Sequence, residues 1–238
     1  MAPPAPAAGP KPWRPPTPSS GGPPPPDPGE TVADALARRV PARPGPEAGL
    51  SVALRELGAV DRAVYEAVAR TPTGNLDAPV RRLSDAANHS KLWLAIAAVV
   101  ALLGGHRGRR AALEGVVAIG VTSAAVNLAV KPIARRRRPD RIGPALFEDR
   151  HVPMPRSASF PSGHAASAFA FAHAVGRHLP VLAVPIRMLA AAVAYSRVHT
   201  GVHYPGDVVV GSVAGAGTAA MVAALADRGA RAWQAGRG

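Results

Sequence analysis

Three short stretches of this 238-residue chain collect the residue types that bind and transfer a phosphoryl group. The first is Lys131–Asp140 with its four consecutive arginines, the second is Pro161–His164, and the third is Ser196–Asp207. Lysine and arginine cations neutralise phosphoryl oxygens, and two histidines, His164 and His203, supply a nucleophile and a proton donor. The combination predicts a site for phosphoryl chemistry.

Small residues and a carboxylate in the same stretches suit that chemistry. A helix that begins at Ser162-Gly163 would direct backbone N–H groups at phosphate oxygens, and Gly163 lets the backbone come close. Asp207 follows His203 by four residues, so its carboxylate can hold one ring nitrogen and set the tautomer. Pro205-Gly206 between them predicts a turn at this point.

Apolar segments separate the three stretches. A membrane-spanning helix needs about 20 apolar residues, and five segments are candidates: 92–105 with its flanks, 111–130, 160–179, 180–195 and 208–226. If the spans alternate in direction, one end of the bundle carries Lys131, Arg138, His164, Arg197, His203 and Asp207. We therefore expect an all-α integral membrane bundle with about five transmembrane helices. A soluble all-α bundle with buried helices is the alternative.

Four regions follow from these patterns. Residues 1–46 contain 16 of the 27 prolines, which predicts a disordered Pro-rich tail over 1–48. Residues 49–90 have amphipathic helical spacing but are too polar to cross a bilayer, which predicts interfacial helices. A membrane-embedded domain is expected over 91–228, and a short C-terminal tail over 229–238.

The composition limits the partners. The net charge of +13 favours an anionic partner such as nucleic acid, a phospholipid surface or a phosphorylated substrate. Aromatic residues make up only 4% of the sequence and form no visible stacking platform, so nucleic acid is not expected. A sequence without cysteine excludes a disulfide framework, a thiol nucleophile and a Cys-ligated metal site.

The spacing of the three stretches resembles the signature of the type 2 phosphatidic acid phosphatase superfamily. That superfamily includes membrane lipid phosphatases, soluble bacterial acid phosphatases and vanadium haloperoxidases. The resemblance covers about residues 91–226, and every signature position is present in order. The matching residues are Lys131, six residues, Arg138-Pro139; Pro161-Ser162-Gly163-His164; and Ser196-Arg197, five residues, His203, three residues, Asp207.

The resemblance implies a role for each matched residue. His203 would attack phosphorus and form a phosphohistidine, with its other ring nitrogen held by Asp207, while His164 would protonate the leaving oxygen. The equatorial oxygens would be held by Lys131, Arg138, Arg197, Ser162 and the Gly163 amide. Neither a metal nor another cofactor is implied, because the cations take the electrostatic role that Mg²⁺ has elsewhere.

Other ionisable residues receive structural interpretations. Arg135–Arg137 are interpreted as a basic cluster that binds anionic lipid. His199 is expected either to be structural or to support a site residue, and Glu114 to be a polar tie between helices or an interface residue. The remaining histidines are expected to be structural: His89, His106, His151, His173 and His178.

The implied substrate is an amphiphilic lipid phosphate. Phosphatidate, phosphatidylglycerol phosphate, polyprenyl diphosphate and polyprenyl-phosphate sugars phosphorylated on the sugar all fit a site at the end of membrane helices. The chain resembles short actinobacterial members, which favours a polyprenyl-linked substrate for cell-wall assembly and a multi-pass location in the cell membrane.

The side of the membrane that holds the site is open, as is the oligomeric state. Related enzymes place the site on the extracytoplasmic face, whereas eight Lys and Arg residues between Lys131 and Ser159 favour the cytoplasm.

Two other functions are alternatives. A vanadium haloperoxidase would hold vanadate with the same cations, although those enzymes are soluble and larger. A non-enzymatic membrane scaffold would act through the Pro-rich tail. The complete signature favours a lipid phosphatase that needs no metal.

Overall fold

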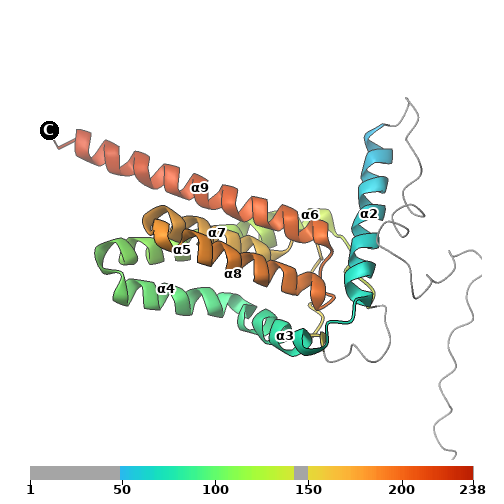
Figure 1. The fold of residues 1–238 in the computed structure, drawn as a ribbon. Helices are drawn as coiled ribbons and strands as arrows, with labels where there is room; N and C mark the ends of the chain where they lie inside the picture. Colours follow the sequence, from blue (N-terminus) through green and yellow to red (C-terminus); the bar gives the residue numbers. More distant parts are fainter. Residues whose placement is uncertain (1–48, 142–149, 238) are drawn as a thin grey trace, which may run out of the picture. The chain divides into compact units, whose positions relative to one another are not determined.

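The computed structural model describes residues 49–141 and 150–237, and the predicted Pro-rich tail lies outside them. The described residues form helices and connecting loops, without strands (Figure 1). The α-helices are α2 (Leu50–Arg70), α3 (Asp77–Ala86), α4 (Lys91–Leu103), α5 (Gly105–Ala124), α6 (Lys131–Ala134), α7 (Gly163–His178), α8 (Pro180–His199) and α9 (Pro205–Ala235). Three further turns are η1 (Gly74–Leu76), η2 (Asn88–Ser90) and the π-helical η3 (Ala125–Val130). The expected all-α fold class is confirmed.

Several of these helices are long and apolar enough to cross a membrane. The continuous helix Gly105–Ala134, α8 and α9 each meet the requirement, and α3 with α4 meets it as a pair bent by 64°. The described residues therefore contain three or four candidate spans, and the expected number of five stays a prediction. α7, with 16 residues, is shorter than the usual span of about 20.

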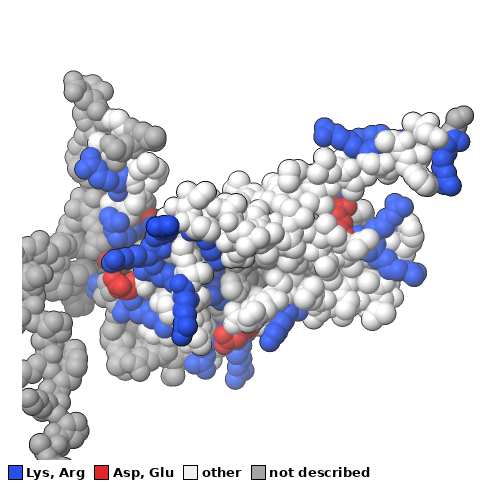
Figure 2. All heavy atoms as spheres, turned by 180° about the vertical axis from the view of Figure 1, so that it is seen from behind, with Lys and Arg blue, Asp and Glu red and all other residues white. Residues whose placement is uncertain are grey.

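The outer surface of the bundle agrees with a membrane location. Several large apolar side chains are at least 79% exposed: Leu102, Leu128, Ile133 and Val181. Exposing such side chains is unfavourable in water and favourable in the lipid hydrocarbon. On the face shown in Figure 2, Lys and Arg gather mostly towards the two ends and along the lower edge, and a broad area between the ends is free of charged residues. This uncharged area is the part that would sit in the hydrocarbon layer.

α7 is the central helix, in contact with α5, α8 and α9. It is rich in buried alanines, so neighbouring backbones approach it closely. Gly211 and Gly215 of α9 face it, and a Cβ at Gly215 would overlap the carbonyl oxygen of Ala166. Pro180 disfavours helical geometry at Leu179, which ends α7, and then opens α8 at its first position.

A polar tie joins three helices at the end of α7 remote from its N-terminus. Glu114 of α5 accepts hydrogen bonds from Arg177 Nε at 3.2 Å and pairs with His178 Nε2 at 2.8 Å. Arg177 also donates two hydrogen bonds to Asp227 of α9, at 2.8 and 3.0 Å. Of the two interpretations of Glu114, the structure supports the polar tie.

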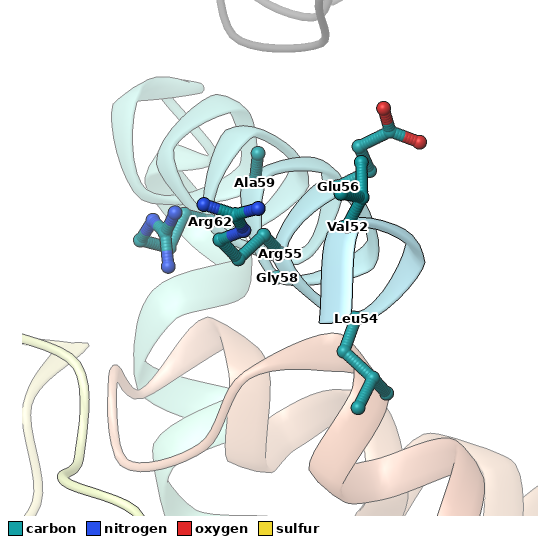
Figure 3. Close-up of a pocket in the computed structure, with 7 residues that line it drawn as sticks. All are labelled: Val52, Leu54, Arg55, Glu56, Gly58, Ala59 and Arg62. Carbon is teal, nitrogen blue, oxygen red and sulfur yellow. The ribbon is translucent and has the colours of Figure 1, made fainter. Parts of the chain in front are cut away.

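α2 contacts the rest of the bundle through α8 and α9. Tyr65 of α2 packs edge-on against Tyr204, with ring centroids 5.5 Å apart. The first half of α2 carries a groove that is lined, among the described residues, by α2 alone. Leu54 and Glu56 of this lining point in different directions (Figure 3). Leu54 and Leu57 are 58% and 65% exposed. The helical, amphipathic character is present, and its place in the membrane interface stays a prediction.

Replacing Gly215 by alanine should destabilise the bundle. The added methyl group overlaps backbone of α7, so we expect the free energy of unfolding to fall by about 1–3 kcal/mol. Gly217→Ala is the matched control on the same helix, because a Cβ there meets nothing within 4 Å, and it should stabilise by up to about 1 kcal/mol. Denaturant unfolding in detergent measures both, and equal effects would contradict the close contact of α7 with α9.

Candidate active site

The three stretches singled out in the sequence meet where α6 ends, α7 begins and α8 turns into α9. Arg138, after α6, donates a hydrogen bond to the carbonyl oxygen of Val202 at 2.7 Å, and its Nη1 lies 3.3 Å from His203 Nε2. The backbone N–H of Ser162 donates to the carbonyl oxygen of Asp207 at 2.9 Å. Segments far apart in sequence are thereby joined at one end of the bundle.

His203 and Asp207 form a buried pair at the start of α9. His203 Nδ1 lies 3.4 Å from Asp207 Oδ2, and the two side chains are 2% and 0% exposed. Asp207 is the third residue of α9, where its carboxylate accepts the backbone N–H of Tyr204 at 2.9 Å and closes a capping box. It also accepts the hydroxyl of Ser159. His203 itself precedes the helix, as Pro205-Gly206 indicates.

Burial sets the charge of His203. It lowers the pKa of the ring to about 4, although the Asp207 carboxylate acts in the opposite direction. The imidazole is therefore neutral near pH 7. With Nδ1 directed at the carboxylate, Nε2 carries the lone pair and points towards Arg138.

Carbonyl oxygens hold the Arg138 guanidinium in place. Besides Val202, it donates to the carbonyl oxygens of Ser157 at 2.9 Å and Ala158 at 3.3 Å. Burial lowers the pKa of Arg138, but a guanidinium starts from so high a value that it keeps its charge. The result is a fixed cation beside His203 Nε2.

Lys131, Gly163 and His164 line a shared cavity of about 170 Å³. Lys131 Nζ lies 3.4 Å from the Ser157 hydroxyl, which Arg138 also contacts at 3.2 Å. The Ser162 hydroxyl caps α7 by accepting the N–H of Ala165 at 3.4 Å. The start of α7 thus presents N–H groups near two cations, as an anion site requires.

Arg197 is held from the opposite side by α3. It is 1% exposed, and its Nη1 donates to the carbonyl oxygen of Ser84 at 3.3 Å and to the Ser84 hydroxyl. Its Nε is buried with no hydrogen-bond partner among the described residues. Its charge acts on both Arg138 and His164, so the third predicted cation belongs to the same site.

Asn88 holds His164 and was not foreseen from the sequence. Its Oδ1 lies 2.9 Å from His164 Nε2. Asn88 comes from η2, the break between α3 and α4, where His89 and Ser90 have φ of 54° and 57°. Nothing in the sequence marks Asn88, because its partner is 76 residues away.

Arg136 differs from its predicted role as a lipid-binding residue. Its guanidinium lies between two carboxylates, 2.9 Å from Asp207 Oδ1 and 2.6 Å from Asp61 Oδ2 of α2. It also stacks on the Tyr204 ring, 4.3 Å from the centroid. Asp61 in turn accepts the backbone N–H of Gly206 at 2.6 Å. α2 therefore contacts the His203–Asp207 pair through Arg136.

His199 has a structural role next to this site. Its Nε2 lies 2.9 Å from Asp77, which also pairs with the buried Arg150 at 3.2 Å. The network joins α8 to η1 and α3. Within residues 49–141 and 150–237, no three His, Asp or Glu side chains gather as the ligands of a metal would.

The link between Arg136 and Asp61 can be measured as a coupling energy. Arg136→Gln leaves Asp207 and Asp61 without their shared cation, so the free energy of unfolding should fall by about 1–3 kcal/mol. In the double variant with Asp61→Asn the loss should be smaller than the sum of the single losses, with a coupling of about 1–2 kcal/mol. Arg137→Gln, at an exposed neighbouring position, is the control. Additive losses would contradict the bridge.

The low pKa of His203 predicts a pH-dependent stability. Above pH 6.5 the ring is neutral in both the folded and the unfolded chain. Between pH 6.5 and 4 only the unfolded chain takes up the proton, so acid favours unfolding. The wild type should lose about 2 kcal/mol at pH 5 relative to His203→Gln, which has no proton to gain. A stability difference between the two proteins that is equal at pH 7 and pH 5 would contradict a buried neutral ring.

Comparison with known proteins places this geometry in a family. The family model described as PAP2 superfamily matches residues 111–230. The chain is 37% identical over 168 residues to a decaprenylphosphoryl-5-phosphoribose phosphatase of Mycobacterium tuberculosis, covering 69% of this chain and 87% of the relative. A protein of the same name from Mycolicibacterium smegmatis is 38% identical, covering 68% and 84%.

Two solved structures share the fold. One is a transmembrane PAP2 type phosphatidylglycerolphosphate phosphatase from Bacillus subtilis, with a TM-score of 0.55, 24% identity, and coverage of 72% of this chain and 87% of that one. The other is LpxE of Aquifex aeolicus, with a TM-score of 0.54, 21% identity, and coverage of 67% and 92%. The site geometry, the family model and the close relatives agree that this chain belongs to the PAP2 superfamily.

Proposed function

We propose that this phosphatase removes the phosphate monoester from the sugar of a polyprenyl-phosphate-linked sugar, as a multi-pass protein of the cell membrane. The observation that carries the proposal is the buried His203–Asp207 pair beside a fixed Arg138 at the end of apolar helices. Such a site reaches a phosphate at the interface while the substrate's chain stays in lipid. The names of the mycobacterial relatives support the choice of a polyprenyl-linked sugar phosphate.

The first chemical step is an in-line displacement at phosphorus. The lone pair of His203 Nε2 forms the N–P bond while the bond from phosphorus to the sugar oxygen breaks. Asp207 holds Nδ1–H and stabilises the positive charge that develops on the ring. His164, protonated on both ring nitrogens in this step, gives its Nδ1 proton to the leaving sugar oxygen and keeps the Nε2–H that faces Asn88 Oδ1.

The cations supply the electrostatic stabilisation of this step. Lys131, Arg138 and Arg197 surround the three equatorial oxygens, together with the N–H groups at the start of α7. Their charge balances the phosphoryl group without a metal ion in our proposal.

The second step returns the enzyme to its starting state. Water attacks the phosphohistidine from the side that the sugar has left, and the now neutral His164 accepts its proton. The N–P bond breaks, its electron pair returns to His203 Nε2, and inorganic phosphate leaves.

Phosphate release from purified protein in detergent tests the proposal. The panel consists of a polyprenyl-phosphoryl phosphoribose, undecaprenyl diphosphate, phosphatidylglycerol phosphate and phosphatidate, each with EDTA present. We expect the sugar phosphate to have the highest kcat/KM and His203→Ala to lower it by about 10³-fold or more. His106→Ala, an exposed histidine at the start of α5, is the control.

Three results would count against the proposal. Loss of activity with EDTA would contradict metal independence, and activity retained by His203→Ala would contradict the nucleophile. A preference for another lipid would agree with phosphatase activity but would contradict the proposed sugar phosphate substrate.

A further inference from the structure

The cavity beside His164 has a polar lining that the transfer of phosphate does not require. Its volume of about 170 Å³ corresponds to about five or six water molecules at about 30 Å³ each. That space is large enough for one small ring. Besides Lys131 and the start of α7, the polar residues that line it are His89, Ser90, Ser123, Asn127 and Ser167.

One wall of the cavity is a polar stripe between two apolar helices. Ser123 Oγ lies 3.4 Å from Ser167 Oγ, across the contact of α5 with α7. One turn further, the Asn127 amide donates to the carbonyl oxygen of Ser123 at 2.9 Å, and its own carbonyl oxygen accepts no hydrogen bond from the described residues. Polar groups in a segment that can span a membrane are costly and mark functional positions.

The backbone on both sides of the cavity departs from regular α-helix. Asn127 lies in the π-helical η3, a kind of turn that is frequent at functional sites. Opposite it, His89 and Ser90 both have left-handed backbone conformations, which cost about 1–2 kcal/mol per residue outside glycine. Both irregular turns direct polar side chains at the same space.

The direction of the proposed reaction places the leaving group in this cavity. In an in-line displacement the bond that breaks lies opposite to the attacking His203 Nε2. The leaving oxygen is the one that His164 protonates, so the carbon group bonded to that oxygen extends past His164. His164 lines the cavity directly.

We infer that this cavity binds the sugar of the substrate and that Asn127, Ser123 and His89 select for it by hydrogen bonds to its hydroxyl groups. The inference rests on the proposed function, because it assigns residues to the leaving group of that reaction. A sugar ring brings hydroxyl groups that these side chains can bind in place of water. A glyceride or a polyprenyl phosphate brings no such set of hydroxyls, so the polar lining favours the sugar phosphate over the other lipids.

A ratio of two substrates tests this assignment. Wild type, Asn127→Ala and Ser123→Ala are compared on a polyprenyl-phosphoryl phosphoribose and on the diphosphate of the same polyprenol, which lacks the sugar. We expect each change to lower the ratio of the two kcat/KM values by about 5- to 10-fold, the effect of one lost hydrogen bond. Thr218→Ala is the matched control, because among the described residues this hydroxyl bonds only to the carbonyl oxygen of Ala214 within α9, and the ratio should not change.

The outcomes distinguish a failure of the cavity assignment from a failure of the proposed function. If wild type hydrolyses the sugar phosphate and the variants keep its ratio, the cavity assignment is wrong while the function stands. Equal losses on both substrates would show a general role in catalysis or folding and would also overturn the assignment. If wild type hydrolyses only the diphosphate, the proposed substrate and the assignment fall together. Unchanged thermal midpoints in detergent confirm that the variants fold.

Discussion

The Asp207 carboxylate is fully buried, and a buried charge is tolerated only when its oxygens are paired and hydrogen-bonded. Four groups from three segments surround it: the His203 ring at 3.4 Å and the Tyr204 N–H at the start of α9, the Ser159 hydroxyl, and Arg136. Satisfying one charge therefore fixes the start of α9, the loop before α7 and the segment after α6. The same contacts hold His203, the nucleophile in our proposal.

Arg136 extends this network beyond the residues that we propose bind phosphate. It joins Asp207 to Asp61, and Asp61 holds the N–H of Gly206 in the turn that carries the pair. α2 is thus connected to the site, although the family match begins only at residue 111. On the other side, Asn88 and Ser84 connect the α3–α4 segment to His164 and Arg197. Both N-terminal helical segments therefore contact the end of the bundle that carries the candidate active site.

The central position of α7 follows from small residues and one polar tie. Alanines in α7 and glycines in α9 let the two backbones approach closely. At the far end, Glu114, Arg177 and Asp227 pair across α5, α7 and α9. Because α7 is held at both ends, its N-terminal Ser162-Gly163-His164 is presented at a fixed place between the cations.

The sequence was sufficient for features that depend on local pattern and failed for those that depend on distant partners. The all-α fold and the helix start at Gly163 follow from apolar runs and helix-start residues near in sequence. The roles of Asp61 and Asn88 do not, since each meets its partner across about 75 residues. Arg136 was misread because four adjacent arginines look alike until one of them is enclosed by carboxylates. The bend between α3 and α4 comes from left-handed residues that are not glycine, which no local rule predicts.

The covalent intermediate is the most direct test of the central claim that His203 is the nucleophile. Purified protein would be mixed with a lipid substrate that carries labelled phosphorus, stopped in base within one turnover, and digested for mass spectrometry. We expect an acid-labile label on His203 in the wild type and no labelled protein in His203→Ala. Turnover without labelled protein, or a label on another residue, would contradict the role that the buried pair with Asp207 assigns to this histidine.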